Sequence, residues 1–420
     1  MYPSSFGELF GATDTGQKTY RKGTHRTVSP SDTIAKVRTL MPEMGITRVA
    51  NVTGLDRIGI PVTMVVRPNS RSVSVSQGKG LTLEGAKASG LMESTETFHA
   101  ERIDLPLEFA SYTDMGKRFP VIEVDSLPRM VNSRFRPDDP IQWIESRNLR
   151  SGESTWLPYE LVHTNYTLPA LPGSGCFVSS SNGLASGNHI LEAILHGICE
   201  VVERDSSSVW HFLDPDSRAQ TRIDIDTVTD PHCRYVIEKL EEADFDICVW
   251  DTTTNVGIAS MYCTITDKRE GNAHPGVGAG CHPLREIALL RALLEAVQVR
   301  TTYISGSRDD LSRSEYETRA MVEKRFQIDN YARGNGSASG HFDETPSHDS
   351  ETFEQDLEWV MGCLQQADID DVFVVDLTRS EYEIPVARVV IPGLEGPHDD
   401  NRYVPGSRIA SLLESRGEQL

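Results

Sequence analysis

Three stretches of the chain carry polar side chains at spacings that place them on one face of a helix. In residues 188–205, Glu192, Glu200 and Glu203 fall within a narrow arc of a helical wheel, opposite a stripe of isoleucine, leucine and valine. The apolar stripe predicts a core-facing side. For a lone helix, the acidic side would be explained most simply as a solvated surface, but the same design occurs twice more.

Residues 83–102 and 284–301 predict two further amphipathic helices. The polar faces of these helices carry Ser89, Glu93 and Glu96 in the first and Arg291, Glu295 and Gln298 in the second. Six glutamates brought together would repel one another and would repel a triphosphate. Hard divalent cations relieve both repulsions, because Mg²⁺ takes oxygen ligands from carboxylates and from phosphates.

A glycine-rich segment precedes each of the three helices. Ser181–Gly187 predicts a turn that opens the first helix, and Gly276–Gly280 predicts a turn before the third. Residues 73–80 predict a strand that ends in a Gly-Lys-Gly turn before the second. Glycines let backbone amides approach an anion, and Lys79 adds a positive charge, although the spacing is not that of a Walker A loop.

Several of these motifs together resemble the YcaO family. The pattern is Ser-Asn-Gly-x-Ala-x-Gly, a spaced glutamate and Glu-x-x-Glu-Arg-Asp within residues 181–205, with Arg-x-x-x-Glu-x-x-Gln-x-Arg at 291–300. The resemblance extends from about Gly23 to Glu395. It implies an α/β fold of mixed β-sheets and packed helices, with an ATP site between three amphipathic helices. It also implies ATP-dependent activation of a backbone amide in a peptide or protein.

The resemblance implies ATP and Mg²⁺ as cofactors and a role for each site residue. The implied Mg²⁺ ligands are Glu93, Glu96, Glu192, Glu200, Glu203 and Glu295. The implied ATP-binding residues are Arg26, Lys79, Ser89, Glu93, Glu96, Asn182, Glu192, Arg204, Arg291, Glu295 and Gln298. The implied catalytic residues are Glu200, Glu203, Arg204 and Arg291.

The arginines of this set also have a simpler explanation. Arg291 with Glu295 and Arg204 with Glu200 are each four residues apart, so either pair could be an ordinary helix salt bridge. For one pair alone that explanation is favoured. All three helices in the family's order favour the ATP site.

The resemblance implies several products, depending on the nucleophile that adds to the amide carbon before the γ-phosphoryl group of ATP activates the oxygen. A Cys, Ser or Thr side chain gives an azoline, external sulfide gives a thioamide and an internal amine gives an amidine. The Gly-Thr-His-Arg segment at 23–26 looks most like members that work with a TfuA partner. The chain shows no domain like a leader-peptide recognition module, and residues 410–420 lack the Pro-x-Pro-x-Pro tail of azoline-forming members.

We therefore expect a thioamide, made with a TfuA-like protein and a sulfur donor. One alternative is an azoline-forming cyclodehydratase that acts on a ribosomal peptide. The other is a non-catalytic ATP-binding accessory subunit for sulfur modification. A homodimer is common in such enzymes, but the residues do not show one.

Composition excludes several classes of function. The 420 residues include 41 Lys and Arg against 62 Asp and Glu, a formal charge of −21 that argues against nucleic acid as the main partner. The seven cysteines form no Cys-x-x-Cys pair, so neither a zinc site nor a redox motif is indicated. We find no apolar run long enough for a membrane span and no signal peptide, and expect a cytoplasmic protein.

The rest of the chain predicts one catalytic unit over residues 21–420. Residues 1–20 predict a flexible lead-in, and the polar, Gly/Ser-rich residues 330–350 predict a mobile loop. Further helices are predicted at residues 29–45, 235–243 and 351–367, and strands at 46–52, 62–67, 247–251, 257–265 and 371–377.

Overall fold

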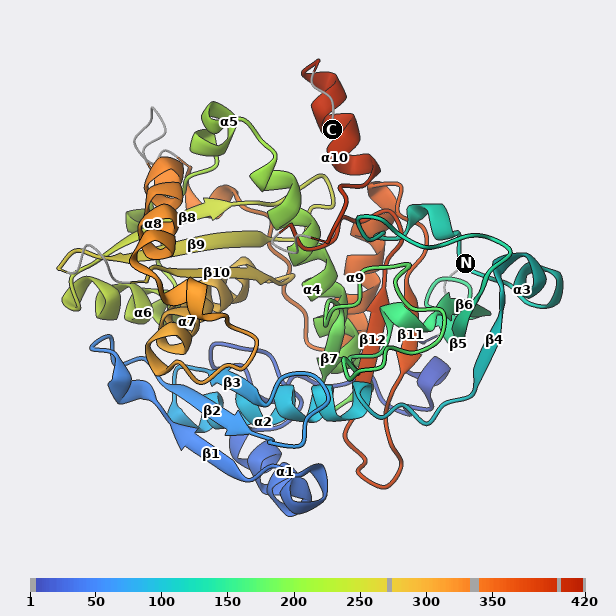
Figure 1. Ribbon diagram of the computed structural model, residues 1–420. Helices are drawn as coiled ribbons and strands as arrows, with labels where there is room; N and C mark the ends of the chain where they lie inside the picture. The colour runs from blue at the N-terminus through green and yellow to red at the C-terminus, as the bar shows by residue number, and fades with distance from the viewer. Residues whose placement is uncertain (1–4, 270–273, 333–339, 399–401, 418–420) are drawn as a thin grey trace. The chain divides into compact units, whose positions relative to one another are not determined.

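A computed structural model of the protein describes residues 5–269, 274–332, 340–398 and 402–417. The chain divides into two compact units (Figure 1). Unit 1 comprises Met1–Lys18, Thr95–Phe212 and Ser350–Leu420, and unit 2 comprises Thr19–Ser94 and Leu213–Asp349. Helix α2 (Leu83–Ala100) contributes residues to both units.

Unit 2 contains two antiparallel sheets. The first has the strand order β1-β2-β3 and the second has the order β10-β9-β8. Helices α6 and α7 share one apolar cluster with β8 and β9, in which Val236, Val249, Met261 and Leu293 are buried. Besides the first part of α2, the elements of unit 2 are α1 (Pro30–Met44), β1 (Arg48–Asn51), η2 (Thr53–Leu55), β2 (Val62–Val66), β3 (Val75–Lys79), α5 (Pro215–Gln220), η5 (Ile225–Thr227), α6 (Pro231–Glu242), β8 (Phe245–Asp251), β9 (Ser260–Asp267), β10 (Gly276–Cys281), α7 (Arg285–Ser305), η6 (Arg313–Tyr316), α8 (Thr318–Ala332) and η7 (Phe342–Glu344).

Unit 1 is built on one larger antiparallel sheet. Its strand order is β4-β5-β11-β12-β7, and β6 pairs with β5. Helix α4 packs against β7 and β12 and also contacts α9. Besides the last part of α2, the elements of unit 1 are η1 (Glu8–Phe10), β4 (Leu107–Ser111), α3 (Tyr112–Arg118), η3 (Val124–Ser126), β5 (Pro140–Asn148), β6 (Ser154–Pro158), η4 (Tyr159–Leu161), β7 (Leu184–Ser186), α4 (Ile190–His211), α9 (Phe353–Gln366), β11 (Phe373–Asp376), β12 (Val386–Val390) and α10 (Ser407–Ser415).

The predicted α/β fold of sheets with packed helices is confirmed, and every pairing between the named strands is antiparallel. Helices α1, α2, α4, α7 and α9 lie where periodicity predicted them, although α4 extends six residues beyond Asp205 to His211. Within the described residues, no helix is both long and apolar enough to cross a membrane.

The glycine-rich segments were predicted only in part. The strand before the second helix and a turn at Asn182 and Gly183 are present, but the turns predicted at Gly78–Gly80 and Gly276–Gly280 are strand instead over most of their residues. Residues 276–281 form strand β10, Gly78 and Lys79 belong to strand β3, and residues 184–186 of the Ser-Asn-Gly segment form strand β7. In β10 the glycines are required because the strand packs closely on the backbone of α7. A Cβ at Gly278 would lie 2.2 Å from the Ala292 carbonyl oxygen, and Gly276 and Gly280 meet the same helix in the same way.

The described parts of the predicted flexible segments make defined contacts. In the lead-in, the Phe6 amide donates to the Glu354 carboxylate at 2.6 Å. In the predicted loop, Phe342 is buried in the apolar core of unit 2, whereas residues 333–339 lie outside the described residues. The flexibility of both segments stays a prediction.

The packing of β10 on α7 makes a specific prediction for Gly278→Ala. The added methyl group meets helix backbone, which cannot move aside without displacing α7, so we expect a loss of about 3 kcal/mol or more in the free energy of unfolding. Urea denaturation measures this loss. The control is Gly362→Ala in α9, where a Cβ meets nothing within 4 Å. The control should gain roughly 0.5–1 kcal/mol, and equal effects of the two substitutions would contradict this account of the strand.

Candidate ATP site

Unit 2 brings together predicted residues from three elements, β3, α2 and α7. The Lys79 ammonium pairs with the Glu295 carboxylate at 2.5 Å, which joins β3 to α7. The Lys79 amide donates to the Ser89 hydroxyl at 3.4 Å. Four of the predicted site residues, Lys79, Ser89, Glu93 and Glu295, are partly buried. The contacts place Lys79 beside both Ser89 and Glu295 within the unit.

Two glutamines of this region keep polar atoms without a partner. The Gln298 amide donates to the Gln77 side-chain oxygen at 3.4 Å. Within the described part of the chain, Gln77 Nε2 and Gln298 Oε1 are buried without a hydrogen-bond partner. Buried polar atoms are normally satisfied, so an unmet donor and acceptor beside Lys79 and Glu295 fit a polar ligand such as a nucleotide.

Glu93 has the most perturbed carboxyl group of this set. Burial raises its pKa to about 7, because removal from water disfavours the charged form, and the positive charges of Lys79 and Arg308 oppose this shift. The backbone N–H of Gln77 donates to the Glu93 carboxylate at 3.4 Å. A carboxyl group with a pKa near 7 is only partly ionised at neutral pH. A divalent cation bound beside it would stabilise its ionised form.

The arginines of α7 differ in their roles. The Arg291 guanidinium donates to the Cys281 carbonyl at 3.0 Å, and Glu295 pairs with Lys79. The simple Arg291–Glu295 helix salt bridge is therefore not what the structure shows. Arg300 is buried and pairs with Asp56 at 2.6 Å and with Asp267 at 3.1 Å. These ion pairs give Arg300 a structural role.

Unit 1 holds the predicted residues of α4 and of the last turns of α2. The Glu96 carboxylate accepts hydrogen bonds from the Ser186 amide at 2.9 Å and from its hydroxyl at 2.7 Å, which joins α2 to β7. Glu203 lies 3.4 Å from the Arg204 guanidinium. The sequence pattern missed the part that Ser186 plays, because its position in a small-residue segment predicted only a turn.

The acidic side of α4 is not a solvated surface. Glu192 is 2 % exposed and Glu203 is 9 % exposed. The Asn188 amide reaches Glu192 at 3.5 Å, and Glu200 is partly buried. Carboxylates this deep carry a large desolvation cost unless cations or hydrogen bonds compensate for it.

The remaining predicted residues lie in loops. The Asn182 side-chain oxygen is buried without a hydrogen-bond partner among the described residues. Arg26 is held by backbone pairing with Tyr20, and its guanidinium donates to the His25 carbonyl at 3.2 Å. The predicted residues thus divide between the two units, with Arg26, Lys79, Ser89, Glu93, Arg291, Glu295 and Gln298 in unit 2 and Glu96, Asn182, Glu192, Glu200, Glu203 and Arg204 in unit 1.

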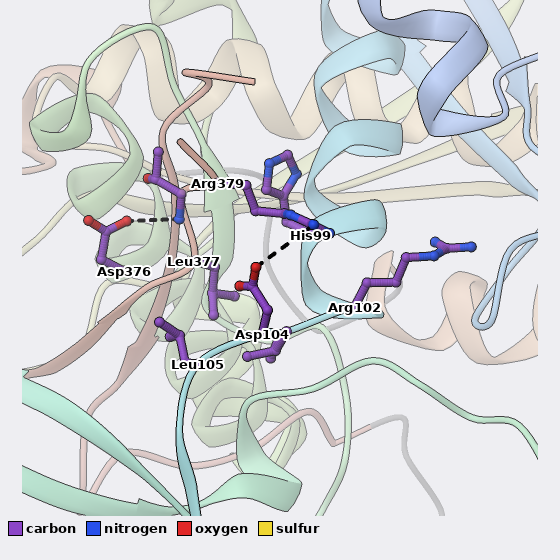
Figure 2. A pocket seen from close by; sticks show the side chains of 9 residues that line it. His99, Arg102, Asp104, Leu105, Asp376, Leu377 and Arg379 are labelled. Carbon is purple, nitrogen blue, oxygen red and sulfur yellow. Dashed lines mark hydrogen bonds and ion pairs between the residues drawn. The ribbon is translucent and has the colours of Figure 1, made fainter. Parts of the chain in front are cut away.

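A separate pocket in unit 1 contains none of these residues (Figure 2). Figure 2 shows the Arg379 guanidinium directed toward Asp104, with which it pairs at 3.8 Å. Burial lowers the pKa of His99 in its wall to about 4, so this imidazole is neutral at pH 7. The lining residues are His99, Arg102, Ile103, Asp104, Leu105, Asp376, Leu377, Thr378 and Arg379.

A protein-family model described as YcaO cyclodehydratase, ATP- and Mg²⁺-binding, matches residues 77–395. The chain belongs to the YcaO family. The resemblance predicted from the motifs is confirmed, and the predicted cofactors ATP and Mg²⁺ are those of the family. The matched residues include both glutamate-bearing segments of α2 and α4 as well as α7.

Relatives of this YcaO protein support the same assignment. A protein in the tfuA 3′ region of Rhizobium leguminosarum bv. trifolii is 34 % identical over 381 residues, which is 88 % of each chain. YcaO from Methanopyrus kandleri, solved with AMPPCP and Mg²⁺, matches with a TM-score of 0.74 at 23 % identity over 93 % of this chain and 98 % of that one. A heterocyclase solved with substrate and cofactor matches with a TM-score of 0.78 at 22 % identity, over 97 % of this chain and 57 % of that one. At these identities the two structures show a shared fold.

The raised pKa of Glu93 predicts how stability depends on pH in the absence of Mg²⁺. Because the folded-state pKa is about 7 against an ordinary 4.5, the folded protein holds this proton more tightly than the unfolded chain. The stability from this group is therefore present below 4.5 and is lost as pH rises through 7. Its upper limit is roughly 3 kcal/mol.

The test is denaturation in a chelator at about pH 5 and about pH 8. Glu93→Gln should remove this part of the pH dependence and make the protein more stable than the native chain at the higher pH. The control is Glu358→Gln, on an exposed position of α9, which should keep the native pH profile. If Glu93→Gln also keeps that profile, Glu93 is not the titrating group.

Proposed function

We propose that this YcaO protein uses ATP to activate a backbone amide of a peptide or protein by phosphorylating the amide oxygen. The observation that carries the proposal is the burial of Glu192 and Glu203 on α4 of a chain whose family binds ATP and Mg²⁺. Oxygen atoms of carboxylates are ligands that hard divalent cations such as Mg²⁺ prefer, so glutamates withdrawn from bulk water on one helix are suited to bind them.

We assign the family chemistry to named residues. The Mg²⁺ ligands would be Glu93, Glu96, Glu192, Glu200, Glu203 and Glu295. The nucleotide would be held by Arg26, Lys79, Ser89, Asn182, Arg204, Arg291 and Gln298, and guanidinium groups are suited to phosphate oxygens by their shape and charge. Glu200, Glu203, Arg204 and Arg291 would act on the transferred phosphoryl group.

The proposed reaction uses ATP to convert the amide oxygen into a good leaving group. An amide carbon is a poor electrophile, and its oxygen leaves poorly. A nucleophile adds to the carbon and converts the carbonyl to an oxyanion. This oxyanion attacks the γ-phosphorus of ATP and displaces ADP. Phosphate then leaves from carbon. With sulfide, loss of the S–H proton gives the C=S bond of a thioamide, and with a Cys, Ser or Thr side chain, loss of the amide N–H proton gives the C=N bond of an azoline. The residues of the chain contribute positioning and electrostatic stabilisation.

We propose sulfide as the nucleophile and a thioamide as the product, with a TfuA-like protein as partner. Support comes from the 34 % identity to a protein in the tfuA 3′ region, which extends over 88 % of the chain, and from the Gly-Thr-His-Arg segment at 23–26. Because the reaction consumes ATP, we expect the enzyme in the cytoplasm.

A second candidate is azoline formation. The family description names a cyclodehydratase, and a heterocyclase shares the fold. In that case a Cys, Ser or Thr side chain of the target replaces sulfide as the nucleophile, and the target loses water instead of exchanging oxygen for sulfur.

The first measurement is calorimetric titration with the ATP analogue AMPPCP, with Mg²⁺ and with a chelator. We expect binding that depends on Mg²⁺ and that Glu203→Gln weakens by about tenfold or more, because one buried ligand charge is removed. The matched control Glu358→Gln removes the same charge from an exposed helix position and should bind as the native chain does. If the native protein and Glu203→Gln bind AMPPCP with equal affinity in Mg²⁺, Glu203 is not an Mg²⁺ ligand.

The product is identified by mass spectrometry of proteins from cells with and without the gene for this chain. A thioamide synthase predicts a peptide that carries sulfur in place of one oxygen only when the gene is present. Water loss at a Cys, Ser or Thr would instead establish the cyclodehydratase. If sulfur modification persists when Glu203→Gln abolishes ATP binding, the chain acts as an accessory subunit.

A further inference from the structure

Arg388 is a buried cation in the middle of strand β12. Its side chain is 2 % exposed, and its strand neighbours are Val375 on β11 and Leu184 on β7. Val386 and Val390, two residues away on either side, belong to an apolar cluster. A guanidinium stays protonated even in such surroundings, and although burial lowers the pKa of Arg388 to about 10, it is charged at pH 7.

The hydrogen bonds of Arg388 leave two donors unmet. Nη2 donates to the Ser180 carbonyl at 2.8 Å. Nε and Nη1 are buried without a hydrogen-bond partner in the described part of the chain, and no ion pair to Arg388 is found there. A buried charge without a carboxylate partner is strongly unfavourable, so this position is explained best by a ligand that arrives with negative charge.

Groups around Arg388 connect it to the candidate ATP site within unit 1. Glu200 on α4 and Tyr166 favour its charged form electrostatically. Burial, assisted by the charge of Arg388, lowers the pKa of His163 to about 4, so this imidazole is neutral at pH 7 and does not compete for an anion.

The backbone that Arg388 holds belongs to the family motif. Ser180 directly precedes the Ser-Asn-Gly turn, and the Arg388 hydrogen bond ties β12 to the start of that turn. The Ser179 hydroxyl and the Asn182 side-chain oxygen are also buried without a partner among the described residues. The segment thus combines a cation with unmet donors and further polar atoms on either side of Ser180.

We infer that Arg388 is a catalytic residue that donates hydrogen bonds to an oxyanion of the reacting centre. This inference rests on the proposed function. The oxyanion is either the γ-phosphoryl group of ATP or the oxygen of the amide adduct. In both cases Arg388 stabilises negative charge and transfers no proton, because its guanidinium stays protonated throughout.

The test compares Arg388→Met and Arg388→Lys with a matched control, Arg402→Met. Arg402 also donates to a neighbouring carbonyl, that of Ser179 at 3.3 Å, but its side chain is exposed. Circular dichroism and thermal unfolding first confirm folding, and Arg388→Lys, which keeps the charge, serves if Arg388→Met fails to fold. The readouts are AMPPCP affinity with Mg²⁺ and the initial rate at which modified target accumulates in cells that express each variant.

We expect Arg388→Met to lower the rate of product accumulation by about 100-fold or more, Arg388→Lys to lower it less, and Arg402→Met to leave it unchanged. Unchanged AMPPCP affinity would assign Arg388 to the oxygen of the amide adduct. A loss of affinity of about tenfold or more would assign it to the phosphoryl group.

A folded Arg388→Met protein with native product accumulation would overturn the inference. Failure of the proposed function looks different, since the native chain itself would then bind no AMPPCP or yield no modified target.

Discussion

The constraint on which the candidate site depends is the cost of burying carboxylates. Helix α4 packs its apolar side against β7 and β12, and its acidic side is also withdrawn from water, with Glu192 at 2 % and Glu203 at 9 % exposure. Folding alone gains nothing from this placement, because charged side chains are stabilised better by water than by a protein interior. The arrangement becomes favourable when cations compensate for the charge, which is the electrostatic situation of an Mg²⁺–nucleotide complex.

Close backbone packing at glycines, of a helix on a strand in unit 2 and of a turn on a strand in unit 1, limits the movement of the segments that carry the site residues. In unit 2 the backbone of α7 lies directly on β10, and the helix has little freedom to shift as long as Gly278 carries no side chain. In unit 1, Gly183 has a φ of 79° and leaves no room for a Cβ, which would lie 2.3 Å from the Val389 carbonyl oxygen. Polar side chains carried by helices held this closely are preorganised for binding and are not free to collapse onto one another.

The sequence predicted the helices well and the strands around them less well, for a physical reason. Helical periodicity in α4 and α7 extends over many residues, and this signal survives in any tertiary context. Alternating glycines in β10 carry no hydrophobic signal, so they predict a turn until the packing helix is known. Pairing between side chains was also unpredictable, because whether Glu295 pairs with Arg291 or with Lys79 depends on where β3 lies.

Burial alone does not identify a functional arginine, as a comparison of two buried arginines shows. Arg300 is 4 % exposed, and Asp56 and Asp267 neutralise it, so its charge is balanced within the fold. Arg388 is 2 % exposed and has only a carbonyl as hydrogen-bond partner among the described residues. Arg300 lies among polar residues at the end of a family motif, and Arg388 lies in an apolar stretch. Neither setting shows whether the fold supplies a carboxylate partner. A protein that spends stability on an unbalanced buried cation needs a compensating interaction. For Arg388, a transient negative charge on a reacting oxygen supplies that compensation at the step where it lowers the barrier.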